Sequence, residues 1–172
     1  IGGLAMALVT LVTWWPTNAF LPFVIQHLVG PGSDAATAAG HVTYANSLFN
    51  LGGFVGTLAT IPISRLGRRP LFAIYFAGAA VSIWVTFGLD WSPLTRMRLL
   101  FFDGLTVFGI VGSFSFYLPE LFPARLRGTG AGFCFNTGRY VAAVGPYTVG
   151  VALGVAATPM AAIRWVALVP LI

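Results

Sequence analysis

The sequence predicts an all-α fold, a polytopic bundle of transmembrane helices. Of its 172 residues, 58% are hydrophobic and only 8% are charged, whereas about 25% of the residues of soluble domains carry a charge. The mean hydropathy is +0.89. Apolar runs of roughly 20 residues, the length that an α-helix needs to cross the hydrocarbon core, follow one another with short polar segments between them. This pattern excludes a soluble globular domain and indicates an integral membrane protein.

Six such runs predict six spans, of which the last is cut short. We expect a piece of a longer protein, because the chain also lacks an initiator Met and opens directly in apolar sequence. No basic region precedes the first run and no small-residue cleavage site follows it, which argues against a signal peptide. The predicted spans are about residues 1–29, 41–63, 71–89, 99–118, 128–153 and 159–172.

The first predicted span contains two prolines, Pro16 and Pro22. Each proline removes a backbone donor, so we expect the helix to kink or open there. Membrane proteins tolerate such breaks where they face protein or a wet cavity. Trp14 and Asn18 are therefore candidates for lining a substrate pathway. The alternative is that the tryptophan marks a membrane interface and the asparagine bonds to a neighbouring helix.

The second span carries Asn46 and Asn50 four residues apart, which puts them on one helix face. Both are candidate substrate contacts. Gly52 and Gly56 follow them at the spacing that lets two membrane helices approach closely. Helix packing is therefore the alternative role of this part of the span.

The polar segment after the second span contains Arg65, Arg68 and Arg69, and cytoplasmic loops are enriched in such residues. Alternating the loops from this point puts Arg125 and Arg127 on the cytoplasmic side as well. Five arginines then lie inside, against two in the loop after the third span. Two separate loops thus agree on the orientation. For the third predicted span we expect only a role in helix packing.

The fourth span contains Asp103, and a carboxylate within a membrane is costly and usually functional. We consider it a candidate for coupling transport to a proton, or for facing the substrate. The alternative is that Asp103, which lies only about a turn inside the membrane, extends toward Arg98 or Arg96 in the preceding loop.

The fifth span contains Arg139, twelve residues beyond Arg127, which places it roughly 18 Å along the helix and near the middle of the membrane. A charge there costs about 3 kcal/mol or more, so a partner has to offset the cost. One possible partner is an acid on another helix, such as Asp103. The other is an anionic substrate, which a guanidinium grips with two parallel hydrogen bonds, supported by Asn136 and Tyr140 on the same face.

A group of charges, the cytoplasmic charge cluster, lies around the segment between the fourth and fifth spans. Small shifts in a network of ion pairs can bias an element with two arrangements, so we predict that these charges form a gate that exchanges partners as helix bundles move. The alternative is a solvated turn at the membrane surface. In this segment the charges are Glu120, Arg125 and Arg127. The family resemblance given below implies that Arg65, Arg68 and Arg69, which follow the second span, close the same side, and the name covers all six residues.

Other classes of function lack their motifs. The glycine-rich residues 128–132 are followed by Phe133 in place of a third glycine, and no strand precedes them, so they do not predict a dinucleotide site. The sequence has no nucleophile elbow, zinc-protease motif or P-loop. A lone Cys134 forms no disulfide and no metal cluster, and arginines in loops do not make a nucleic-acid surface. We expect no enzyme activity, no cofactor and no metal.

Two stretches resemble a known family. S-R-L-G-R-R-P, residues 64–70, resembles the cytoplasmic loop motif in the second half of major facilitator superfamily transporters. Y-L-P-E-L-F-P-A-R-L-R-G-T-G, followed by F-N-T-G-R-Y-V-A-A-V-G-P, resembles the tenth-to-eleventh helix region of the metabolite, sialate and aromatic-acid proton symporters of that superfamily. The resemblance covers essentially the whole chain. It departs at Ser64, where the family loop has an acid, so it does not support a charge relay through this loop.

The resemblance implies that residues 1–172 are the C-terminal half, helices seven to twelve, of a twelve-helix transporter in the plasma membrane, the inner membrane in a bacterium. It implies that the first and fourth spans line a central cavity and that the fifth contributes from the side. It also implies proton symport of a small organic acid by alternating access, in which two six-helix bundles rock about a site at the midplane. The partners are then this acid, the proton, the lipid bilayer and the N-terminal six-helix half.

Other functions are compatible with the same spans. A sugar or polyol porter of the same superfamily would leave Arg139 with a structural role. A non-transporting sensor or assembly module would use the fold without moving a substrate. A membrane enzyme is disfavoured, because no span carries a paired acid and base or a metal cluster.

Overall fold

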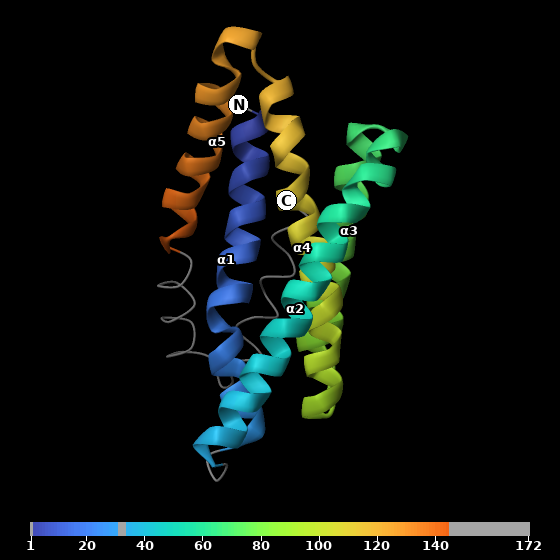
Figure 1. The fold of residues 1–172 in the computed structure, drawn as a ribbon, viewed down its shortest axis with the longest axis vertical. Helices are drawn as coiled ribbons and strands as arrows, with labels where there is room; N and C mark the ends of the chain where they lie inside the picture. Colours follow the sequence, from blue (N-terminus) through green and yellow to red (C-terminus); the bar gives the residue numbers. More distant parts are fainter. Residues whose placement is uncertain (1, 31–33, 145–172) are drawn as a thin grey trace.

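The computed structural model describes residues 2–30 and 34–144, and within them every regular element is a helix. The all-α prediction is thereby confirmed for this part of the chain (Figure 1). The sixth predicted span and the end of the fifth lie outside the described residues. In chain order the elements are α1 (Gly2–Val29), α2 (Ala35–Ile63), η1 (Ser64–Leu66), α3 (Arg68–Gly88), α4 (Pro93–Glu120), η2 (Ala124–Leu126) and α5 (Arg127–Ala142).

Helices α2 and α4 begin about six residues earlier than the apolar runs predict. The start of α4 follows capping rather than hydropathy: Ser92 Oγ accepts a hydrogen bond from the Thr95 amide at 3.3 Å, and Pro93 occupies the first turn, where its missing N–H costs nothing. Helix α1 is continuous through Pro16 and Pro22. The expected opening of the first span was therefore wrong, since the helix accommodates both prolines.

Within the described residues, three segments are long and apolar enough to cross a membrane: Ala35–Leu66, Arg68–Gly88 and Pro93–Glu120. A shorter apolar stretch, Gly2–Trp14, lies within α1. Helices of this length and composition support an integral, multi-pass membrane protein.

Helices α2 and α4 pack against each other more extensively than any other described pair. A Cβ added to Gly52 or Gly56 on α2 would overlap a backbone carbonyl of α4, and a Cβ on Gly104 would overlap the carbonyl of Phe49 on α2. The three glycines therefore let the two backbones touch. The packing role considered for Gly52 and Gly56 is confirmed.

Helix α3 packs along α4, and its residue Tyr75 contacts both α2 and α4. The Tyr75 hydroxyl donates to the carbonyl of Gly56 on α2 at 2.7 Å, and its ring fills the space where Gly109 of α4 has no side chain. Helix α1 packs against α5, α2 and α4. Helices α5 and α3 thus lie on opposite sides of the bundle (Figure 1).

The turn from α2 to α3 and the turn from α4 to α5 lie at the same end of the bundle (Figure 1). Gly67 makes the first turn possible, because its φ of 103° is in a region that other residues rarely adopt. Both turns carry arginines of the cytoplasmic charge cluster. The fold therefore gathers these charges at one end, as the predicted orientation requires.

Candidate functional site

A hollow of about 230 Å³ lies between α1, α4 and α5. Its walls are almost entirely apolar, and Arg139 supplies their one charged group. Trp14 lies edge-on to the Phe108 ring, with ring centroids 5.9 Å apart. The structure thus brings Trp14 and Arg139 to one place, although 125 positions separate them in the chain. The lining residues are Leu11, Trp14, Phe108, Val111, Phe135 and Arg139.

Arg139 also borders a second, more polar hollow of about 370 Å³. Asn136, Tyr140 and Ala143 complete its lining. The Asn136 side-chain amide donates to the carbonyl of Gly132 at 2.8 Å, so its oxygen is left to accept from a ligand. Tyr140 is 80% exposed. The grouping of Asn136, Arg139 and Tyr140 on one face of α5 matches the prediction, while their role stays a prediction.

A third hollow, about 330 Å³ and almost wholly apolar, lies between α4 and α5. It shares Val111 and Phe135 with the hollow at Trp14, and its other residues, among them Leu118 and Pro119, lie toward the end of α4 that carries the charge cluster. The hollows therefore form a series that leads from Arg139 toward that end of the bundle. We call this series the α4–α5 passage.

Arg139 has no ion-pair contact with an acid among the described residues. Asp103, the acid considered as its partner, is fully buried and lies beside Ser82 and Thr86 on α3. Arg139 projects instead from α5, on the other side of α4. The pairing of Asp103 with Arg139 is therefore wrong, because α4 turns the carboxylate toward α3.

Asp103 also does not extend toward Arg96 or Arg98, which lie in the first turns of α4. Its side chain is inside the bundle at 0% exposure, and the Arg96 guanidinium donates to the carbonyl of Leu89 at 2.9 Å. The Ser82 and Thr86 hydroxyls are the hydrogen-bonding neighbours of the Asp103 carboxylate, although neither makes a contact of full hydrogen-bond geometry. Its role in coupling stays a prediction.

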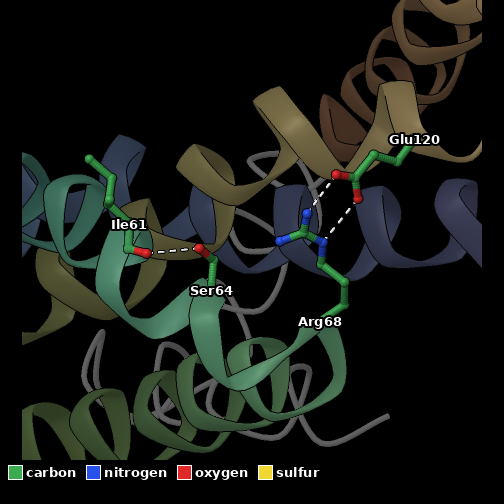
Figure 2. Close-up of polar contacts among 4 residues, drawn as sticks. All are labelled: Ile61, Ser64, Arg68 and Glu120. Atoms are coloured by element: carbon green, nitrogen blue, oxygen red, sulfur yellow. Dashed lines mark hydrogen bonds and ion pairs between the residues drawn. The ribbon is translucent and has the colours of Figure 1, made fainter.

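The cytoplasmic charge cluster contains a two-point ion pair. Arg68, the first residue of α3, donates from Nε and from a terminal nitrogen to the two oxygens of Glu120, the last residue of α4, at 2.9 Å and 2.5 Å (Figure 2). The guanidinium also lies 4.7 Å from the centre of the Phe116 ring. This fork geometry fixes the orientation of the two side chains more strongly than a single hydrogen bond would. It connects the ends of two helices that belong to different predicted spans.

The other members of the cluster surround this pair without joining it. Arg65, Arg69, Arg125 and Arg127 are exposed, and the positive charge of Arg127 acts on Glu120 from the α5 side. The Ser64 hydroxyl donates to the carbonyl of Ile61 at 2.8 Å (Figure 2). The charge cluster is thus organised around one arginine and one acid, and its role as a gate stays a prediction.

Three predicted pathway residues do not line the hollows described above. Asn18 is half-buried on α1. On α2, the Asn50 amide donates to the carbonyl of Asn46 at 2.8 Å, within its own helix. Their substrate contacts remain predictions. Within residues 2–30 and 34–144, no three His, Cys, Asp or Glu side chains come close enough to hold a metal ion.

Comparison with known proteins relates the chain to transport proteins of bacteria. It is 29% identical to a cis,cis-muconate transport protein of Acinetobacter baylyi over 80% of its length, and 27% identical to a gentisate transporter of Corynebacterium glutamicum over 84%. It is 32% identical over 66% of its length to a protein of Cupriavidus pinatubonensis named a probable 4-methylmuconolactone transporter. The chain belongs to the family of these transport proteins, the major facilitator superfamily.

This major facilitator chain spans only a part of its relatives: the alignments cover 32%, 27% and 31% of the three proteins. No family model and no solved structure matches the chain. The relatives therefore assign the family, whereas the positions of Arg139, Trp14 and the Arg68–Glu120 pair come from the fold itself.

Sequence reasoning missed the apolar walls of the site. Leu11, Phe108, Val111 and Phe135 look like any lipid-facing residues of a membrane helix, and only the packing of α1, α4 and α5 shows that they border one hollow. A signal was present in α4, where Phe108 and Val111 alternate with small residues, but it does not distinguish a cavity wall from a packed interface.

Proposed function

We propose that this chain is the C-terminal half of a secondary active transporter that moves a small organic anion together with a proton by alternating access. The observation that carries the proposal is the placement of Arg139, a cation without a described acidic partner, at the meeting point of two hollows in the bundle. Arg139 is exposed on the described part of the bundle, and a cation at the depth of the membrane is costly unless an anion offsets its charge. An anionic substrate supplies that partner during transport.

The site supports an anion with a carboxylate and an apolar body. Arg139 holds the carboxylate with two parallel hydrogen bonds, while the Asn136 oxygen and the Tyr140 hydroxyl bind polar substituents. The rest of the molecule contacts Trp14 and Phe108, whose rings favour flat, unsaturated groups. Two of the relatives are named for cis,cis-muconate and gentisate, which are organic acids of this kind.

The Arg68–Glu120 pair serves as a gate at the cytoplasmic end in this proposal. It ties the first residue of α3 to the last residue of α4, next to the end of the α4–α5 passage. The exposed arginines around it offer new partners to Glu120 when the helices shift. The missing N-terminal half supplies the other wall of the central cavity, and the full protein resides in the plasma membrane, the inner membrane in a bacterium.

Counterflow uptake by the full-length protein in proteoliposomes tests this function. Labelled organic acids, sugars and polyols are each offered with and without an imposed proton gradient. We expect a carboxylate to exchange across the membrane without the gradient and to accumulate only with it. Accumulation of neutral sugars instead would leave the fold assignment intact and refute the anion-binding role of Arg139. A protein that exchanges none of the compounds would favour a sensor or assembly module.

A further inference from the structure

The interface between α3 and α4 contains a buried polar site that is separate from the hollow at Arg139. Asp103 has 0% exposure, and Thr86 opposite it on α3 has 1%. The hydroxyls of Ser82 and Thr86 are the hydrogen-bonding neighbours of the carboxylate, although neither carboxylate oxygen makes a contact of full hydrogen-bond geometry within the described residues. A fully buried acid with no counter-charge and no well-formed hydrogen bond requires an explanation.

A groove of about 340 Å³ between α3 and α4 is bordered by Ser82 and Thr86, the two neighbours of the Asp103 carboxylate. Its lining is apolar except for three hydroxyl-bearing residues, Ser82, Thr86 and Thr106. The Ser82 and Thr106 hydroxyl oxygens lie 3.1 Å apart and form a hydrogen bond between the two helices. Hydroxyl groups both donate and accept, so this row can pass a proton between the groove and the carboxylate.

The polar site and the substrate hollow lie on different faces of α4. Phe108 and Val111, which line the hollow, are five and eight residues beyond Asp103, or about 140° and 80° around the helix. The hollow is formed with α1 and α5, whereas the groove is formed with α3. We therefore expect a substrate held by Arg139 to contact α4 away from Asp103.

The surroundings of Asp103 suit a neutral carboxylic acid better than a carboxylate. A buried charge without a counter-charge is costly, while a protonated carboxyl group needs only an acceptor such as a hydroxyl. No charged side chain among the described residues forms an ion pair with Asp103; Arg98, five residues before it on α4, is exposed, whereas Asp103 is fully buried. Tyr75 of α3 donates to the carbonyl of Gly56, and Arg96 of α4, two turns away, donates to the carbonyl of Leu89.

We propose that Asp103 is a proton-binding site in the α3–α4 interface that couples to substrate transport through α4, without contact with the substrate. This inference rests on the proposed transport function. The carboxylate takes a proton from water in the groove and later returns it to water; one O–H bond forms and one breaks. The neutral acid lets α3 and α4 close on each other, whereas the charged form admits water and loosens them.

The same two helices carry the gate, which explains how a lateral site can act on transport. Asp103 and Glu120 are both on α4, roughly 25 Å apart along the helix axis, and both face α3. A change in the α3–α4 contact at Asp103 therefore moves the helix pair that the Arg68–Glu120 ion pair holds at its end. That movement also shifts Phe108 and Val111 at the substrate hollow.

The test uses full-length protein in proteoliposomes and the acid that the wild type exchanges. Asp103→Asn keeps the shape of the side chain but cannot release a proton. We expect this variant to retain exchange, with a half-saturating concentration within about twofold of wild type, because the substrate site is elsewhere, and to lose accumulation driven by a proton gradient. Asp90→Asn, which changes an exposed acid in the loop between α3 and α4, serves as the matched control and is expected to accumulate normally.

Several results separate this inference from the proposed function. Normal accumulation by Asp103→Asn would show that the proton binds elsewhere, and loss of exchange affinity by a folded Asp103→Asn protein would show that Asp103 contacts or shapes the substrate site. Accumulation by the wild type under a sodium gradient alone would refute the claim that a proton drives transport. In all three cases the wild type still exchanges an organic acid, so the proposed function stands; if the wild type exchanges none, the proposed function fails first.

The double variant Ser82→Ala, Thr86→Val is expected to slow gradient-driven uptake without weakening exchange affinity.

Discussion

Replacing Gly104 with alanine tests the contact that holds α4 in place. The new Cβ would overlap the backbone carbonyl of Phe49 on α2, and a backbone atom cannot rotate away as a side chain can. Overpacking of this kind costs about 1–3 kcal/mol. The higher helix propensity of alanine returns at most about 1 kcal/mol. Because the clash is with a backbone atom, we take the upper end of that range and expect a net loss of about 2 kcal/mol, roughly a 30-fold change in the ratio of folded to unfolded protein.

The measurement is the unfolding of detergent-solubilised full-length protein, followed by heating or by titration with a denaturing detergent. Gly40→Ala is the matched control, since Gly40 also lies in a helix and a Cβ there would meet nothing within 4 Å. This control is expected to be as stable as wild type or slightly more stable. Equal stability of Gly104→Ala and Gly40→Ala would refute the close approach of α2 and α4.

Three further substitutions test other contacts. Glu120→Gln removes the charge that Arg68 binds, so the maximal transport rate is expected to change more than the half-saturating concentration; loss of affinity at an unchanged rate counts against a gate. Exchanging the two residues, Arg68→Glu with Glu120→Arg, is expected to restore part of the rate, and no rescue would mean that the pair does not act as a unit. Tyr75→Phe deletes one hydrogen bond to Gly56 and is expected to lower stability by about 1 kcal/mol, measured by the same unfolding assay; an unchanged stability would indicate that this bond does not hold α3 to α2.

The helical class and the approximate positions of the helices follow from hydropathy alone, because a membrane helix has to be apolar over a fixed length. The ends of the helices do not follow from hydropathy. Polar turns such as Pro93 to Arg98 continue a helix beyond the hydrocarbon region, where caps decide its limits. The prolines of α1 predicted an opening that the helix does not have, because a missing backbone hydrogen bond does not end a helix that neighbouring helices support.

The candidate site was predictable where its chemistry is unusual for a membrane. Arg139 and Asp103 stand out because charged groups are rare there, and the arginines around Glu120 stand out as a group. Which charged residue meets which depends on the rotation of each helix about its axis. Sequence spacing alone left Asp103 as a partner for Arg139, whereas the packing of α3 on α4 turns Asp103 away and pairs Glu120 with Arg68.

The most direct test of the account is the affinity of the Arg139→Ala protein for the organic acid that the wild type exchanges, measured by exchange in proteoliposomes. Two charge-assisted hydrogen bonds are lost, so we predict a weakening on the order of 100-fold, with Arg139→Lys intermediate because it keeps the charge but not the fork. Arg98→Ala, at an exposed position near the start of α4, is expected to bind like wild type. A folded, membrane-inserted Arg139→Ala protein with wild-type affinity would contradict the claim that Arg139 holds the substrate.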